Sequence, residues 1–548
     1  LKDYGCYFET SSNEMAAAAM LTASVFEPVR GAVTWKVLGN GVGQDVVDHV
    51  SQLGVKDGAM IIVGEDYGGS STTVLQRTLP WGHKIGMPVI DSRHDQQVLH
   101  RMVKEGMDLS RDSNSVVALL LRPQHSHANA EIKVGDNVRP KISTVNKLKE
   151  FRRDPTIFAL PPYSFQQEAK RFEERLPTVA RLIVERQLNE FFGNEEAKVG
   201  IITHGTTFNT TLRLLSIMGL ADEFGALDSR IHLLQLNVIY PLNDEQIADF
   251  IGDKTHVLLV EEGQPDLMES HIRALIQKKD IRVKFFGHDL VPKYGELIPE
   301  KLGPALAQFL MQAIPETGTA PGDAVQNLIS RKRQAVGMFP APVPPRFPTF
   351  CTGCPERPVF SQMKIQEYTT GVKDWHGGDV GCYGMAGFIP FQMSDSNVGM
   401  GAGMAAASAV SAMSEQHNVS VVGDGTLWHS AFNTSAANAI YNRQDSTYIV
   451  LDNKWTAMTG AHENPNVGKL MTGEVVGTEM SIVKTFAAMG VKKIETANPY
   501  NFRDFQDKMK KIRRDAKIPQ VRVLISDAEC MLQKQRRVKP ERAAAIKA

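Results

Sequence analysis

The feature that most constrains the fold of this chain is a turn, Gly423-Asp424-Gly425, placed directly after a short β-branched run at residues 418–422. Residues 430–442 then have helical spacing and are rich in alanine, and a second β-branched run at 446–451 ends in Asp452-Asn453. This order predicts a strand–turn–helix–strand unit of a parallel sheet. Because parallel sheets bind their ligands outside the carboxyl ends of the strands, we expect the turn and the asparagine to meet at one edge.

The residue types at this edge suit a Mg²⁺ ion bound to phosphate. Asp424 offers a carboxylate oxygen, Asn453 an amide oxygen and Trp455 a backbone carbonyl, and Mg²⁺ prefers a few such ligands completed by substrate phosphates. Glycines let the backbone approach a diphosphate, and the following helix points its N-terminus at the anion. The alternative is a simple tight turn, since Gly-Asp and Asp-Gly pairs are common turn chemistry. The asparagine at the next strand end favours the site.

Composition limits the class of protein. A chain of 548 residues is expected to hold about three domains. Lys+Arg and Asp+Glu balance at 61 each, which indicates neither a nucleic-acid nor a membrane partner, and no run approaches the ~18–20 apolar residues of a membrane span. The first residues do not form a signal peptide, and a start at Leu1 suggests that an upstream segment is missing. Five sparse cysteines indicate a reducing compartment, and we expect a cytoplasmic protein.

The spacing of the GDG turn and the asparagine resembles that of the thiamine diphosphate (TPP) enzymes. The fuller pattern GDGTLWHS…LDNKWTAMTG resembles one branch of the 2-oxoacid:ferredoxin oxidoreductases, the α subunit of indolepyruvate ferredoxin oxidoreductase. The resemblance implies an α/β fold with two TPP-binding, doubly wound parallel-sheet domains, one of pyrimidine-binding (PYR) type and one of diphosphate-binding (PP) type, and a transketolase C-terminal-like α/β domain between them. The resemblance also implies that Asp424, Asn453 and Trp455 bind Mg²⁺. The full set of cofactor-binding residues that it implies is Gly423, Asp424, Gly425, Thr426, Asn453, Trp455, Met458, Asp379 and Cys382.

Composition and the resemblance together divide the chain into five segments. We expect a PYR-type domain that lacks its N-terminal part, a charged helical connector, a transketolase C-terminal-like domain without catalytic residues, a Pro/Gly-rich linker extended where the prolines cluster, and a PP-type domain. Their respective ranges are 1–132, 133–195, 196–314, 315–348 and 349–548.

The expected PYR-type domain contains a helix over residues 11–26 and buried strands at 59–63 and 116–121. Its Ser11-Ser12-Asn13-Glu14 stretch matches the family's SxNE segment, which implies that Glu14 activates the aminopyrimidine ring of the cofactor. The alternative role for Glu14 is a favourable charge at a helix N-terminus.

Three further matches lie at strand ends or in loops, where ligand-binding groups are common: Lys36, Arg122 and His127. For each of them taken singly, a solvated surface position is the better interpretation.

The cysteines allow several kinds of site. Cys351 and Cys354 form a CxxC, which is compatible with a redox disulfide, a zinc site or an iron–sulfur site, while Cys382 and Cys530 could be small buried residues. The resemblance implies that all four hold a [4Fe–4S] cluster, and Cys6 lies outside the pattern. This chain reads CTGCPER where the family has CPGCPHR, so Glu356 replaces a histidine.

The resemblance implies TPP-dependent oxidative decarboxylation of arylpyruvates, such as indolepyruvate and phenylpyruvate, to aryl-acetyl-CoA. Coenzyme A is then a co-substrate, and electrons pass through the cluster to ferredoxin or another acceptor. His429 would handle protons and Met458 would bend the cofactor, although either residue could simply pack in the core.

The same resemblance implies a partner, a smaller γ-type subunit in an (αβ)₂ assembly. The chain ends in KPERAAAIKA without the family's ferredoxin-like domain, so we expect electrons to leave through another subunit or by a path that differs from the family's. Two alternatives stay open: a non-oxidative TPP-dependent decarboxylase and a catalytically silent scaffold subunit.

Overall fold

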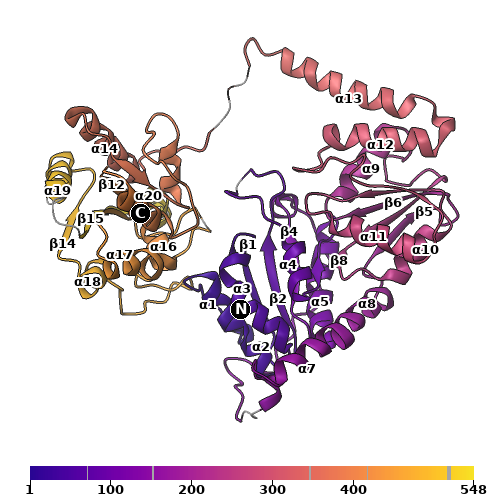
Figure 1. The fold of residues 1–548 in the computed structure, drawn as a ribbon, viewed down its shortest axis with the longest axis horizontal. Coiled ribbons are helices and arrows are strands. Elements are labelled where there is room, and N and C mark those ends of the chain that lie inside the picture. Colours follow the sequence, from indigo (N-terminus) through magenta and orange to yellow (C-terminus); the bar gives the residue numbers. More distant parts are fainter. Residues whose placement is uncertain are drawn as a thin grey trace. The chain divides into compact units, whose positions relative to one another are not determined.

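The computed structural model describes residues 1–70, 72–150, 154–342, 344, 347–415, 417–458, 460–514 and 520–547 (Figure 1). The chain divides into two compact units. The first consists of Leu1–Tyr7 and Glu14–Val343, and the second of Phe8–Asn13 and Pro344–Ala548. Within the described residues, the two units contain three five-stranded sheets.

The first unit begins with a parallel sheet of strand order β1-β2-β4-β3, to which β8 adds an antiparallel edge. Its strands are β1 (Gly31–Lys36), β2 (Ala59–Gly64), β3 (Val89–Ile90), β4 (Val117–Leu121) and β8 (Val238–Tyr240). Its helices are α1 (Glu14–Leu21), α2 (Ala23–Phe26), α3 (Gly39–Leu53), α4 (Thr78–Ile85), α5 (Gln96–Ser113) and α6 (Pro123–His127). β2 and β4 are almost wholly buried, as strands covered by helices on both faces must be.

The second sheet of this unit has the order β10-β9-β6-β7-β5, parallel except for β5. Its strands are β5 (Glu190–Gly193), β6 (Val199–His204), β7 (Ile231–Leu236), β9 (His256–Val260) and β10 (Lys284–Phe286). The helices of this region are α7 (Tyr163–Ala169), the π-helix η3 (Lys170–Arg175), α8 (Leu176–Glu185), α9 (Thr207–Ile217), α10 (Asp244–Gly252), α11 (Leu267–Lys278), α12 (Pro299–Ala313) and α13 (Ala320–Gly337).

The second unit contains one fully parallel sheet of order β11-β12-β13-β15-β14. Its strands are β11 (Trp375–Gly377), β12 (Asn418–Gly423), β13 (Ser446–Asp452), β14 (Lys493–Ala497) and β15 (Val521–Asp527). The helices are α14 (Glu356–Thr370), the 3₁₀ helix η5 (Cys382–Gly387), α15 (Gly403–Met413), α16 (Asp424–Thr426), the π-helix η6 (Leu427–Ala436), α17 (Ala437–Tyr441), α18 (Ile482–Ala488), α19 (Phe502–Arg514) and α20 (Met531–Lys547). Apolar clusters cover both faces of β12, β13 and β15.

The expected α/β architecture with parallel sheets is present, and the differences are local. The helix expected over residues 11–26 begins at Glu14 and is interrupted at Thr22. The range predicted as linker, 315–348, contains an 18-residue helix, α13, because its only proline, Pro321, lies in the first turn, where a missing N–H costs nothing. Among its described residues, which exclude 151–153, the predicted connector is helical from Tyr163 on, apart from a short 3₁₀ turn before it.

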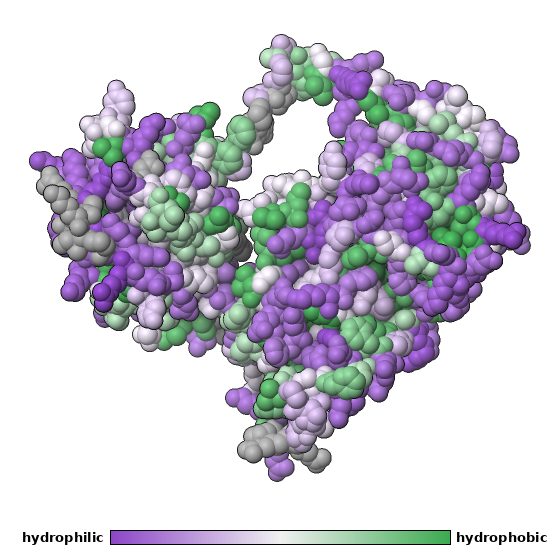
Figure 2. Space-filling model, in the orientation of Figure 1, coloured by the Kyte–Doolittle hydropathy of each residue, from purple (hydrophilic) through white to green (hydrophobic). Residues whose placement is uncertain are grey.

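The face of the molecule in Figure 2 is mainly hydrophilic, with small separate apolar patches. The end of α13 carries some of the exposed apolar side chains, Val336, Met338 and Phe339. Within the described residues, every helix is too short or too polar to cross a membrane.

Candidate active site

The GDG turn lies where the sequence predicts it, at the carboxyl end of β12. Gly423 pairs with Leu451 of β13, so the next residues, Asp424 and Asp452, lie level on adjacent strands. The Asp424 side chain is 1% exposed, and its Oδ1 accepts a hydrogen bond from the backbone N–H of Gly425 at 2.8 Å. Burial, reinforced by the charge of Asp452, raises the pKa of Asp424 to about 7. Two buried carboxylates side by side therefore need a counter-charge.

Two asparagines that the sequence did not single out complete this edge. Asn466 donates to Asp452 Oδ1 at 2.8 Å and to Asp424 Oδ2 at 3.5 Å, so it bridges the two carboxylates. Asn464 is also buried, and its hydrogen bond holds the pKa of Asp424 lower than burial alone would. Lys454, 2.9 Å from Asp452, supplies the nearest cation. The edge thus presents hard oxygen and amide groups, the set that Mg²⁺ and a diphosphate require.

Asn453 joins this edge to the cysteines. Its Oδ1 accepts from the backbone N–H of Trp455 at 3.0 Å, and its Nδ2 donates to Glu356 Oε1 at 3.1 Å. Its carbonyl oxygen accepts from the backbone N–H of Cys530 at 2.8 Å. The asparagine is 7% exposed, and its two side-chain contacts, to Trp455 and Glu356, fix which way its amide points.

The four cysteines of the predicted cluster lie close enough to affect one another electrostatically. All five cysteines of the chain are free, Cys6 included. Within the described residues, no three of the four sulfurs lie within 4.8 Å of one another. Four thiolates around one zinc ion lie about 3.8 Å apart, given a Zn–S distance of about 2.3 Å. Some of the distances between the cysteine sulfurs are therefore longer than those around a single zinc ion.

The thiols lie in surroundings that disfavour their anions when no metal is bound. Burial, followed by the charge of Glu356, raises the pKa of Cys354 to about 12, and the same two causes raise that of Cys382 further. Burial also raises the pKa of Glu356 to about 8, and its Oε2 has no hydrogen-bond partner among the described residues. Glu356, which stands where the family pattern has a histidine, thus lies between the cysteines and Asn453.

Asp379 and Thr426 lie next to the GDG turn, and both contact the hydroxyl of Tyr383. Asp379 Oδ2 accepts from the backbone N–H groups of Gly401 and Gly403 at 3.1 and 3.0 Å, and Oδ1 accepts from the hydroxyl of Tyr383. The Tyr383 hydroxyl also lies 3.0 Å from Thr426 Oγ1. These bonds attach Asp379 to the first turn of α15. Burial nevertheless raises its pKa to about 6.

His429 is 8% exposed and lies on the π-helix η6, an irregular helix type that is frequent at functional sites. Its Nδ1 is 2.9 Å from Ser430 Oγ, and its carbonyl accepts from Asn13 Nδ2 at 2.7 Å. Met458, in contrast, is 49% exposed. Met458 is therefore not a residue of the hydrophobic core.

In the first unit, Glu14 begins α1 and lies against the first turn of α3. A Cβ atom on Gly39 would come within 2.6 Å of Glu14 Cγ and 3.0 Å of its Oε1, so only glycine leaves room for this side chain. Asn40, the next residue, accepts from Trp35 Nε1 at 2.8 Å and donates to Thr78 Oγ1 at 3.1 Å. The carboxylate thus lies at the carboxyl end of β1, on a rigid support.

The surface position favoured for Arg122 is wrong. Its guanidinium is 2% exposed, donates to both oxygens of Asp91 at 3.1 and 2.6 Å, and reaches Glu262 at 3.3 Å. The Tyr67 ring lies 3.6 Å from it. No local sequence pattern predicts these partners, because they come from distant parts of the chain. His127 is exposed and Lys36 is half-buried.

A parallel sheet with GDG at one strand end and asparagine at the next defines the class of TPP enzymes. Residues 379–523 match the family "Thiamine pyrophosphate enzyme, C-terminal TPP binding domain", and residues 189–334 match "Indolepyruvate oxidoreductase domain". The subunits IorA of indolepyruvate oxidoreductase from Thermococcus kodakarensis and Pyrococcus horikoshii are 28% and 25% identical to the chain, each over 97% of it and 80% of the relative. The IorA subunit from Methanothermobacter marburgensis is 26% identical, with the same coverage.

The chain is therefore an enzyme subunit with a TPP-binding domain, and it is similar over nearly its whole length to the IorA subunits of indolepyruvate oxidoreductase. Among solved structures, it is similar to a 2-oxoglutarate:ferredoxin oxidoreductase from Magnetococcus marinus, with 16% identity, a TM-score of 0.38 and 56% of each chain covered.

Proposed function

We propose that this chain carries out the TPP-dependent oxidative decarboxylation of arylpyruvates, indolepyruvate and phenylpyruvate among them, to aryl-acetyl-CoA. The relatives named above are indolepyruvate oxidoreductase subunits, which supports the substrate class. The observation that carries the proposal is Asn453, which contacts Glu356 at 3.1 Å and Cys530 at 2.8 Å. Through it, a cysteine site capable of electron transfer adjoins a diphosphate edge.

Asp424, Asn453 and the Trp455 carbonyl would hold Mg²⁺, with the diphosphate approaching along Gly423, Gly425 and Thr426. The raised pKa values of the neighbouring carboxylates Asp424 and Asp452 support this assignment, because Lys454 pairs with Asp452 alone and a divalent cation would supply further positive charge. Bound TPP supplies the carbon centre at which a 2-oxo acid loses CO₂. Glu14 would hold a proton at the aminopyrimidine ring, and His429 would orient or move protons near the substrate.

Cys351, Cys354, Cys382 and Cys530 would ligate a [4Fe–4S] cluster, and the wide spacing of their sulfurs supports a cluster over zinc. Electrons would leave for ferredoxin or another acceptor, and coenzyme A would take the acyl group. The relatives are named as subunits, which supports a smaller partner subunit in an (αβ)₂ assembly. Five free cysteines support a reducing, cytoplasmic setting.

The test is the iron and acid-labile sulfide content of anaerobically purified protein, with its visible spectrum, compared with Cys382→Ala. We expect about four iron and four sulfide per chain and a broad brown absorbance that the substitution abolishes. Cys6→Ala is the matched control, because Cys6 lies outside the site, and should keep the iron. A colourless wild-type protein that binds TPP and Mg²⁺ would favour the non-oxidative decarboxylase, and one that binds no TPP would favour the scaffold subunit.

A further inference from the structure

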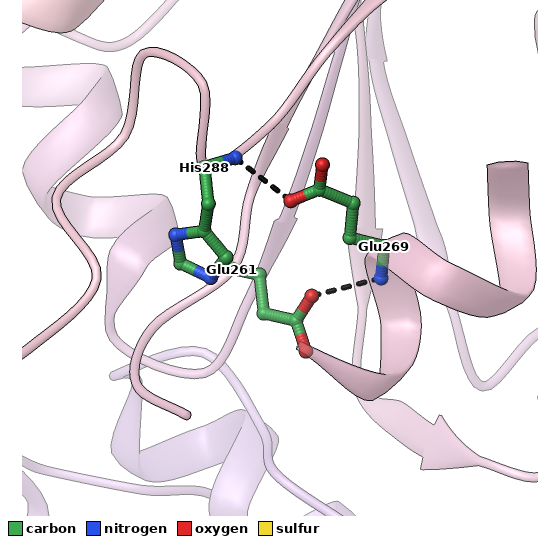
Figure 3. A group of neighbouring side chains, drawn as sticks. All are labelled: Glu261, Glu269 and His288. Atoms are coloured by element: carbon green, nitrogen blue, oxygen red, sulfur yellow. Dashed lines mark hydrogen bonds between the residues drawn. The ribbon is translucent and has the colours of Figure 1, made fainter. Parts of the chain in front are cut away.

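A second group of possible metal ligands lies in the first unit, at the carboxyl edge of the sheet formed by β5, β6, β7, β9 and β10. Glu261 directly follows β9, Glu269 lies in the first turn of α11, and His288 follows β10. The three side chains converge from these three elements (Figure 3). One ligand atom from each lies within 4.8 Å of the other two. All three residues are buried, with exposures of 2%, 6% and 8%.

The hydrogen bonds of the two carboxylates orient them without exhausting their oxygens. Glu261 accepts from the backbone N–H groups of Met268 and Glu269 at 3.1 and 2.8 Å. Glu269 accepts from the backbone N–H of His288 at 2.7 Å and from Arg273 Nε at 2.7 Å. Each carboxylate oxygen can accept two bonds, so a lone pair remains on every one of them.

The ring of His288 has the arrangement typical of a metal ligand. Its Nδ1 is 3.2 Å from the carbonyl oxygen of Val291, which can only accept, so the proton resides on Nδ1. Nε2 therefore carries a bare lone pair, and it is buried without a hydrogen-bond partner among the described residues. Metal-binding histidines almost always donate their other ring N–H to a carbonyl or carboxylate in this way.

The local charge also favours a cation. Glu261 and Glu269 bring two buried carboxyl groups together, and of these two Arg273 contacts only Glu269, while it also donates to Asp289 at 3.1 Å. Gly287 leaves room for this arrangement, because a Cβ there would lie 2.3 Å from Glu269 Oε2.

We propose that Glu261, Glu269 and His288 bind a structural divalent transition-metal ion, best matched by Zn²⁺, that joins β9, α11 and the loop after β10. One imidazole and two carboxylates suit zinc better than Mg²⁺ or Ca²⁺, which prefer oxygen alone. An ion at the centre of a triangle with 4.8 Å sides is about 2.8 Å from each corner, so movements of about 0.7 Å give Zn–N and Zn–O distances of about 2.0–2.2 Å. A water molecule would complete the tetrahedron.

The experiment uses the full-length chain, stripped with a chelator and titrated with Zn²⁺ and, separately, Co²⁺. Because the cysteines can also bind these ions, Co²⁺ provides the discriminating signal. A nitrogen–oxygen site gives only weak visible ligand-field bands, whereas thiolate sites add intense sulfur-to-cobalt charge transfer. We expect one equivalent without charge transfer that persists both in Cys382→Ala and in Asp424→Asn, the second of which removes a proposed Mg²⁺ ligand.

His288→Gln and Glu261→Gln should weaken binding of this equivalent by about 100-fold or more, since even supporting residues of metal sites are worth about 10–100-fold. His271→Ala is the matched control, because it removes an exposed histidine from α11 and should leave binding unchanged. Zn²⁺ should also raise the Tm of the wild type and of His271→Ala, but not of His288→Gln.

Wild-type binding in a folded His288→Gln variant would overturn the proposal. Should these variants fail to fold, the Co²⁺ titration of Asp424→Asn decides alone, and the absence there of an equivalent free of charge transfer overturns the proposal.

Discussion

The side-chain amide of Asn453 donates to Glu356 Oε1 across 3.1 Å, and both residues are more than nine-tenths buried. This bond joins Glu356, which follows Cys351-Thr352-Gly353-Cys354-Pro355, to Asn453, which follows the last residue of β13. Because the amide is also held by the backbone N–H of Trp455, its oxygen and nitrogen cannot exchange places without breaking both bonds. Glu356 is therefore a positioning residue for a proposed Mg²⁺ ligand.

Glu356→Ala should leave the Asn453 N–H group buried without an acceptor, which costs about 1–3 kcal/mol. Glu356→Gln keeps an amide oxygen at the same place and should cost less. Chemical denaturation and Mg²⁺-dependent TPP binding by calorimetry measure both effects. Equal losses in the two variants would mean that the bond does not position Asn453.

Gly39→Ala should displace the Glu14 side chain, because the added Cβ would lie 2.6 Å from Glu14 Cγ. A shift of about 1 Å at a reacting group can cost about 100-fold in rate, so we expect kcat to fall by that order. Gly41→Ala, in the same helix, meets nothing within 4 Å and should retain full activity, with a gain of up to about 1 kcal/mol in helix stability. Steady-state kinetics of the two variants and of Glu14→Gln test this, and an active Gly39→Ala would count against the role of Glu14.

Asp424 should make the cofactor-free protein less stable as the pH rises. Its pKa is 3.8 when unperturbed and about 7 in the folded protein, so between these values the folded state holds a proton that the unfolded state has lost. Stability is therefore lost across this window, by at most about 4 kcal/mol from this group.

Asp424→Asn should flatten that pH dependence and abolish Mg²⁺-dependent TPP binding, whereas Asp527→Asn, at an exposed neighbouring strand end, should do neither. Denaturation of the cofactor-free proteins from pH 4 to pH 8 provides the measurement. If stability fell with pH equally steeply in Asp424→Asn and in the wild type, Asp424 would not be the source of the pH dependence.

Arg122→Met should destabilise the first unit by about 3–5 kcal/mol, because it leaves Asp91 and Glu262 buried without their cation. Arg101→Met removes a half-exposed guanidinium 3.9 Å from Glu190 and should cost no more than about 1 kcal/mol. The urea midpoints of the two variants compare these effects. A small loss in Arg122→Met would show that the carboxyl groups protonate at little cost.

The parallel strands could be read from the sequence because β-branched runs ended in polar turns, as at residues 418–422 and 446–451. Asp424 and Asn453 lie where that pattern placed them. The sequence pattern does not assign Asn466 to the site, because an asparagine in a loop carries no periodic signal. It does not assign Asp452 either, although this residue directly precedes Asn453. Their part in the site depends on strand register, which pairs Gly423 with Leu451.

The burial of Arg122 could not be read from the sequence for a related reason. Its partners Asp91 and Glu262 lie 31 and 140 residues away along the chain. Local patterns describe a strand end, but only the assembled sheets bring such groups together. The assignments of Glu14, His429 and the cysteines remain predictions.

The edge strand β8 has a consequence for how this chain can be divided. It lies between β7 and α10 in the sequence, yet it pairs with β3 of the preceding sheet. A fragment ending near residue 132 would lack this strand and the Glu262 partner of Arg122, and would expose the β3 edge to other chains. The two sheets of the first unit should therefore be expressed together as one piece.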